Sequence, residues 1–208
     1  MSVLDSITRD LDWRETEIAS MRLLLLSKSV TSSQSAVLLR AAWALLYAHY
    51  EGFCKNALNI FFDAAQGSGI KCADLPNPMK VLALNDAFVK LRNLPISVFL
   101  GEIESFSTSY LDQIPEFPEV DTRSNLWPSV LIELMKSADL SPAKVEEHQA
   151  KLSTLVARRN GIAHGENNII PEFKYYKSYE DVVYEVIYDL AFQIEEKLQG
   201  VPFGAGIE

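Results

Sequence analysis

The sequence predicts an all-α protein, a helical bundle of about five to seven helices. Apolar residues recur at helical spacing in several long segments, and no segment shows the strict alternation that is typical of a β-strand. The breaks between these segments are short and rich in Ser, Gly or Pro, which favours short connections between packed helices.

The helical segments follow one another along most of the chain. Residues 34–66 have the strongest pattern, and because apolar residues surround most of the helix circumference, we expect this helix to be largely buried. The other expected helices cover residues 3–28, 79–93, 97–105, 127–138 and 178–198, with one more that begins near Ser141-Pro142 and runs into the segment around residue 160.

The length of 208 residues is enough for one well-buried domain, which we place over residues 1–200. Residues 94–122 contain several prolines and acidic residues, so we expect an irregular insertion there. Asn125 is a candidate cap for the helix over 127–138. Residues 201–208 are expected to form a loose C-terminal tail.

The composition limits the possible functions. The net charge of −9 argues against a general nucleic-acid binder, so an RNA substrate would need a local basic patch or a partner that supplies charge. Two cysteines and three histidines at scattered spacings form no disulfide framework or zinc pattern. No apolar run is long enough for a membrane span, and no signal peptide is indicated, so we expect a cytoplasmic protein without a metal or other cofactor.

One stretch, residues 155–166, concentrates the chemically versatile side chains. Asn160 and His164 are four residues apart and share a helix face, whereas Arg159 and His164 are roughly 140° apart on an ideal helix. Gly165 is a stop signal, so we expect His164 in the last helical turn. We expect both Arg159 and His164 to be largely accessible to solvent. By itself the pattern also fits a basic helix C-terminus that is stabilised by the helix dipole.

The string Arg159-Asn160-x-x-x-His164 resembles the Arg-x4-6-His signature of the HEPN superfamily (higher eukaryote and prokaryote nucleotide-binding domains). In addition, Tyr47-x-x-x-Glu51-Gly52-Phe53 resembles a helix of a toxin-like, defence-associated HEPN branch. The segment 121–126, Asp-Thr-Arg-Ser-Asn-Leu, resembles a short segment of the same branch.

Arg40, Tyr47 and Glu51 lie on one face of the expected helix over 34–66. Two interpretations remain open. These side chains form an internal ion pair or contact a loop backbone, or they form a second wall of a site opposite Arg159 and His164. His49 lies nearby, and a packed or surface role fits it better than catalysis.

The resemblance implies a metal-independent endoribonuclease with Arg159, Asn160 and His164 as its site, shared across a two-fold homodimer. His164 would act as the base towards the 2′-hydroxyl, and Arg159 would bind phosphate. Arg40, Tyr47, Glu51 and Arg158 are weaker supporting candidates. The expected partners are an RNA substrate, a second copy of the chain, and an antitoxin or defence-complex protein.

One position departs from the resemblance. Some HEPN toxins have a tyrosine two residues after the histidine that a partner nucleotidyltransferase modifies, whereas this chain has Glu166 there. The glutamate would repel phosphate unless it is paired, and Arg158 is the expected partner. The second hypothesis is a non-catalytic HEPN module that binds a nucleotide or a protein, which fits the acidic composition.

Overall fold

The computed structural model describes residues 3–203, and these residues form nine α-helices and no β-strand. The helices are α1 (Val3–Leu25), α2 (Ser32–Gly67), α3 (Asn77–Ala83), α4 (Asn85–Arg92), α5 (Ile96–Phe106), α6 (Pro128–Ser137), α7 (Ala143–Glu147), α8 (Gln149–Ala163) and α9 (Phe173–Gln199). A short 3-10 helix, Cys72–Asp74, precedes α3, and a π-helical turn, Ser107–Leu111, follows α5. The predicted all-α class is confirmed.

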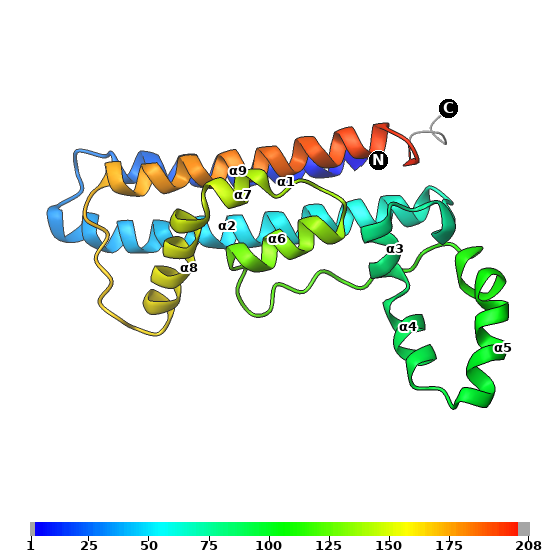
Figure 1. Cartoon of the computed structure of the whole chain (residues 1–208). Coiled ribbons are helices and arrows are strands. Elements are labelled where there is room, and N and C mark those ends of the chain that lie inside the picture. Colours follow the sequence, from blue (N-terminus) through cyan, green and yellow to red (C-terminus); the bar gives the residue numbers. More distant parts are fainter. Residues whose placement is uncertain (1–2, 204–208) are drawn as a thin grey trace.

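Three long helices form the framework. Helices α1, α2 and α9 lie side by side, and α8 packs against α2 and α9 while it runs across their direction rather than along it (Figure 1). Helices α6 and α7 cover the same side of the framework as α8, whereas α4 and α5 extend away from it at the far end of α2. The core therefore lies along α2.

Helix α2 is buried because it is surrounded by other elements. It begins at a capping box in which the Thr31 hydroxyl accepts from the backbone N–H of Gln34 and the Gln34 side chain accepts from the backbone N–H of Thr31. Its aromatic residues Trp43, Tyr47, Tyr50 and Phe53 are all fully buried. The indole N–H of Trp43 donates to the carbonyl of Leu155, 3.1 Å away, and so joins α2 to α8.

The packing of α1 against α2 favours a glycine in the Glu-Gly-Phe string, at Gly52. Arg14 of α1 is buried, pairs with Asp10 at 3.0 Å and lies against α2. A Cβ atom at Gly52 would be 2.9 Å from Nη1 of Arg14, closer than side chains tolerate. Gly52 therefore leaves room for an arginine between the two helices.

A buried carboxylate joins α1 to α9. Glu180 of α9 is fully buried and forms an ion pair with Arg22 of α1. Lys177 approaches the same carboxylate oxygen at 3.1 Å. Burial, and then the neighbouring Glu180, raise the pKa of Tyr176 well above its ordinary value, so this tyrosine stays protonated beside the carboxylate.

The structure has more helices than predicted because two expected helices are broken. The helix expected over 79–93 is two helices, α3 and α4, which meet at Leu84. The helix expected to run from Pro142 into the motif breaks at His148, between α7 and α8. In both places the apolar spacing continues across the break, so periodicity gave no signal.

The insertion expected over 94–122 contains α5 and the π-helical turn, so its irregular part begins at residue 112. That part is still anchored: the backbone N–H of Val120 donates to Asn59 Oδ1 of α2 at 3.0 Å, and Phe117 stacks on Phe62. In the tail expected to be loose over 201–208, Phe203 is instead buried against Phe61. Residues 204–208 lie outside the described range, and the division into one domain with an insertion stays a prediction.

We expect the stability of this bundle to fall as the pH drops below 6.5, in part because of His49. Burial lowers the pKa of His49 from its ordinary value of 6.5; Glu17 opposes this shift, and Arg14 adds to it. The unfolded chain therefore binds a proton at a pH where the folded chain does not, and stability is lost between 6.5 and the lower folded pKa. Urea unfolding at several pH values between 7.5 and 5.5 gives the free energy of unfolding at each pH. This free energy should fall less steeply with decreasing pH for His49→Gln than for the wild type, and an equal fall in both would contradict the prediction.

Candidate functional site

The Arg-x4-His motif lies at the C-terminal end of α8. The helix ends at Ala163, and His164 is the capping residue, whose backbone N–H donates to the carbonyl of Asn160 at 2.9 Å. Gly165 follows with a φ of +81°, a left-handed conformation that favours glycine. The side chain of His164 is exposed. The structure thus places His164 at the helix end, as the sequence predicted.

Arg159 is held in a fixed position by three neighbours. Its guanidinium lies over the ring of Tyr47, 4.3 Å from the ring centroid. Its Nη1 donates to Asn125 Oδ1 at 3.0 Å and to Asn160 Oδ1 at 2.9 Å. Because a guanidinium can only donate, both asparagines must turn their oxygens towards it. All three neighbours are uncharged, so they orient Arg159 without neutralising it.

The expectation that Arg159 is as accessible as His164 is wrong. Arg159 is half-buried, because it covers the fully buried ring of Tyr47. Removing its side chain would therefore cost some stability as well as a positive charge, and this changes how an Arg159 variant should be interpreted.

Asn125 is a neighbour of Arg159 that the sequence did not reveal. The expectation that it caps the next helix is wrong, since α6 has Trp127 at its N-cap without a side-chain hydrogen bond. Asn125 instead ends a tight turn in which Arg123 and Ser124 have positive φ angles. The only available signal was its place in the segment 121–126, which resembles a HEPN segment.

Tyr47 joins this turn to α2 and supports Arg159. Its hydroxyl accepts from the buried backbone N–H of Leu126 at 2.9 Å. Burial raises the pKa of Tyr47 to about 12, with Glu51 adding to the rise, so the hydroxyl stays protonated. Tyr47 thus reaches the candidate site through its contact with Arg159.

Arg40 and Arg158 contact the loop that follows His164. Arg40 donates to the carbonyl of Glu166 at 2.9 Å, and Arg158 donates to the carbonyl of Ile169 at 2.9 Å. Of the two interpretations of the α2 face, a contact to loop backbone holds for Arg40, while Tyr47 forms a wall beside Arg159. Within residues 3–203, no ion pair joins Arg40 to Glu51.

The expected pair between Glu166 and Arg158 is not formed in the described chain. The carboxylate of Glu166 accepts from Asn168 Nδ2 at 3.1 Å, and both side chains fold over Gly161. A Cβ atom at Gly161 would lie 2.5 Å from Glu166 Oε2 and 2.1 Å from Asn168 Nδ2. Gly161 therefore makes room for the glutamate to pack against α8.

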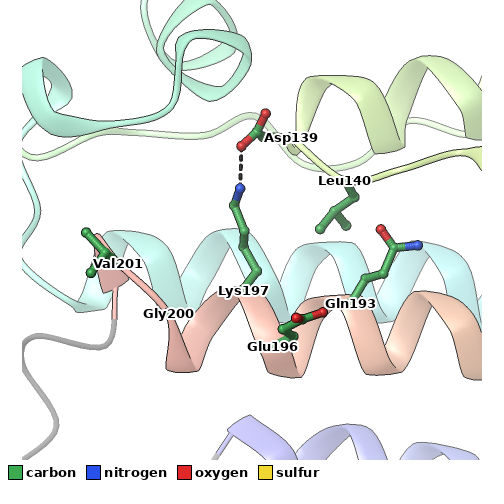
Figure 2. Close-up of a pocket in the computed structure, with 7 residues that line it drawn as sticks. All are labelled: Asp139, Leu140, Gln193, Glu196, Lys197, Gly200 and Val201. Carbon is green, nitrogen blue, oxygen red and sulfur yellow. Dashed lines mark hydrogen bonds and ion pairs between the residues drawn. The ribbon is translucent and has the colours of Figure 1, made fainter.

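We also examined the described residues for metal-ligand clusters, membrane-spanning helices and pockets. Among residues 3–203, no group of three or more His, Cys, Asp or Glu side chains is placed to hold a metal ion. In the same range, no helix combines the length and the apolar character that crossing a membrane requires. A small pocket at the other end of α9 has a Lys197–Asp139 ion pair at its edge (Figure 2). It contains none of the candidate residues.

A helical bundle with Arg-x4-His at the end of a packed helix is the arrangement expected of a HEPN domain, a class that comprises RNase-like and nucleotide-binding modules. A family model described as HEPN_MAE_28990-like HEPN matches residues 3–203, nearly the whole chain, and the protein therefore belongs to this HEPN family. No curated protein and no solved structure matches the chain.

Substituting Asn125 separates the charge of Arg159 from its position. Asn125→Asp keeps an acceptor for Arg159 but adds a negative charge, so we expect stability to be kept or raised. Any activity that depends on the charge of Arg159 should fall about tenfold or more, since opposite charges 4 Å apart interact by roughly 1–4 kcal/mol at this kind of surface. Asn125→Ala is the matched variant. It should lower the free energy of unfolding by about 1 kcal/mol, and it should reduce activity less than Asn125→Asp does, because it adds no charge. Thermal melting and RNA cleavage on both variants test this, and equal activities would argue against a role for the charge.

Proposed function

We propose that the protein is a metal-independent endoribonuclease of the HEPN type that acts in the cytoplasm as a toxin or defence effector. The 2′-hydroxyl of the RNA attacks the adjacent phosphorus, and the bond to the 5′-oxygen breaks. The leaving 5′-oxygen takes up a proton from water, so the direct products are a 2′,3′-cyclic phosphate and a 5′-hydroxyl. Hydrolysis of the cyclic phosphate by water would then give a 3′-phosphate. His164 takes the proton of the 2′-hydroxyl, and Arg159 binds the phosphate whose charge grows in the transition state.

The observation that carries this proposal is the set of partners of Arg159. Two amide oxygens and one aromatic ring hold the guanidinium, and no carboxylate in the described chain pairs with it. By contrast, Arg14, Arg22 and Arg123 each pair with a carboxylate, which offsets their charge. The remaining donors, on Nε and Nη2, are free to form the two-point contact that phosphate geometry favours.

His164 suits the role of base. It is exposed one turn beyond Asn160, and a neutral imidazole has a ring nitrogen that can accept a proton. Since Asn160 Oδ1 is used by Arg159, Asn160 positions the arginine in the free protein. In this proposal Tyr47, Glu51 and Asn125 are positioning residues.

A homodimer would complete the site. Arg159 is directed towards α2 and the 121–126 turn, whereas His164 lies at the end of α8, and the two are roughly 140° apart around an ideal helix. We propose that the Arg159 of one chain acts with the His164 of its two-fold partner. Mixing inactive Arg159→Ala and His164→Ala chains should then restore about a quarter of the activity, because half of the dimers are mixed and each has one intact site. No recovery in mixed dimers would contradict a shared site.

The alternative is a non-catalytic module that binds a nucleotide or a protein partner. The net charge of −9 favours it, because long-range repulsion would slow the approach of RNA. Incubating the purified protein with a labelled RNA pool in EDTA distinguishes the two functions. The ribonuclease should yield fragments with a 5′-hydroxyl, which a polynucleotide kinase can label directly. Intact RNA at high enzyme concentration, with tight binding of a nucleotide, would support the alternative.

A further inference from the structure

Helix α8 has a charge unlike that of the rest of the chain. Its fifteen residues include Lys151, Arg158 and Arg159 but no Asp or Glu, although the protein has 28 acidic residues. It is therefore a positively charged element in an acidic protein, and the candidate site lies at one end of it.

Two of these cations are held by neutral groups, as Arg159 is. Arg158 lies 5.0 Å from the ring centroid of Tyr175 and donates to the carbonyl of Ile169. Lys151 lies 5.8 Å from the ring centroid of Tyr179 and donates to the carbonyl of Ser178 at 3.1 Å. Aromatic rings and carbonyl oxygens fix a cation without cancelling its charge.

Many other cations on the surface have a carboxylate partner instead. Within the described range, several exposed lysines and arginines pair with carboxylates, as in Lys55–Glu119, Arg123–Glu133 and Lys136–Glu146. Within residues 3–203, no carboxylate pairs with Lys151, Arg158 or Arg159, so these side chains form a line of unpaired cations beside the candidate site.

The three cations follow the helix. Lys151 and Arg158 are seven residues apart, so they share a face of α8 and are separated by about 10 Å along its axis. Arg158 is adjacent to Arg159. Tyr175, which is half-buried, and Tyr179 are one turn apart on α9, and their hydroxyls are hydrogen-bonded at 2.9 Å. The line therefore leads from the candidate site along the α8–α9 boundary.

We propose that Lys151 and Arg158 bind backbone phosphates of a single-stranded RNA on one side of the bond that is cleaved. This inference rests on the proposed function and adds a substrate-binding track to it. A single strand fits because its flexible backbone can follow two cations about 10 Å apart on one helix, and such backbone contacts tolerate many sequences.

The test measures the salt dependence of RNA binding. In a His164→Ala background, which prevents cleavage during the measurement, a fluorescent oligouridine is titrated at several salt concentrations. Lys151→Ala and Arg158→Gln should each weaken binding and reduce the slope of log K against log salt by about 0.7, the value for one lost phosphate contact on a single strand. Lys90→Ala, an exposed lysine on α4, is the matched control and should leave the slope unchanged.

The outcomes separate this inference from the proposed function. Since Arg158 also contacts Trp43 and the following loop, Arg158→Gln is paired with Lys151→Ala, whose side chain is exposed. If the wild type cleaves RNA but Lys151→Ala binds with an unchanged slope, the track is overturned and the ribonuclease stands. If the wild type neither binds nor cleaves RNA, both proposals are overturned.

Discussion

Replacing His164 with alanine is expected to lower the rate of RNA cleavage by a factor on the order of 10²–10⁴, the usual loss when a general base is removed. The melting temperature should not change, because the side chain is exposed and its removal should cost less than about 0.5 kcal/mol. Cleavage assays in EDTA and thermal melting on the same preparation measure both quantities. Asn167→Ala, an exposed neighbour in the same loop, is the control.

Arg159→Ala should also abolish cleavage, but it should differ from His164→Ala in stability. Because Arg159 covers the Tyr47 ring, its removal should lower the free energy of unfolding by about 1 kcal/mol. Arg159→Lys should keep part of the stability and little of the activity, since an ammonium lacks the planar fork. Wild-type cleavage by folded His164→Ala and Arg159→Ala chains would show that the site lies elsewhere.

Replacing Arg22 with alanine is expected to have the largest effect on stability. It leaves the fully buried carboxylate of Glu180 with Lys177 as its remaining cation. Breaking a buried ion pair in this way costs about 3–5 kcal/mol. We expect a value near the lower end, about 3 kcal/mol, because Lys177 compensates in part, and a melting temperature lower by about 6–12 °C.

The control for Arg22 is Arg9→Ala, an exposed arginine on the same helix that should change the melting temperature by little. If both variants melt alike, the pair between α1 and α9 contributes little to the bundle. Arg22→Ala should also reduce cleavage only in proportion to the unfolded fraction, since Arg22 pairs with Glu180 of α9 and is not a candidate residue of the site.

The predicted fold class and the motif at the end of a helix were correct because both depend on local patterns. Apolar spacing identified the long helices, and Gly165 identified where α8 ends. The breaks at Leu84 and His148 were missed because apolar residues continue on both sides of each break. A helix interrupted by one non-helical residue keeps nearly the same hydrophobic pattern.

The neighbours of Arg159 could not be predicted from spacing. Asn125 is 34 residues away from Arg159, and its position depends on a turn with two positive φ angles, neither at a glycine. Likewise, Glu180 and Arg22 are 158 residues apart, and a glutamate among the charged residues of α9 looks like a surface residue in the sequence. Long-range polar contacts of this kind have no periodic signature.

The fixed position of Arg159 over Tyr47 affects the conformational entropy that binding would cost. Fixing a flexible arginine side chain in one conformation costs up to about 2 kcal/mol of conformational entropy. In this protein that entropy is lost when the chain folds, not when a ligand binds. A phosphate that arrives at Arg159 would find the donors already oriented, so association would lose less entropy there than at a mobile surface lysine. Folding thus uses Asn125, Asn160 and Tyr47 to orient the Nε and Nη2 donors of Arg159, which have no hydrogen-bond partner within residues 3–203.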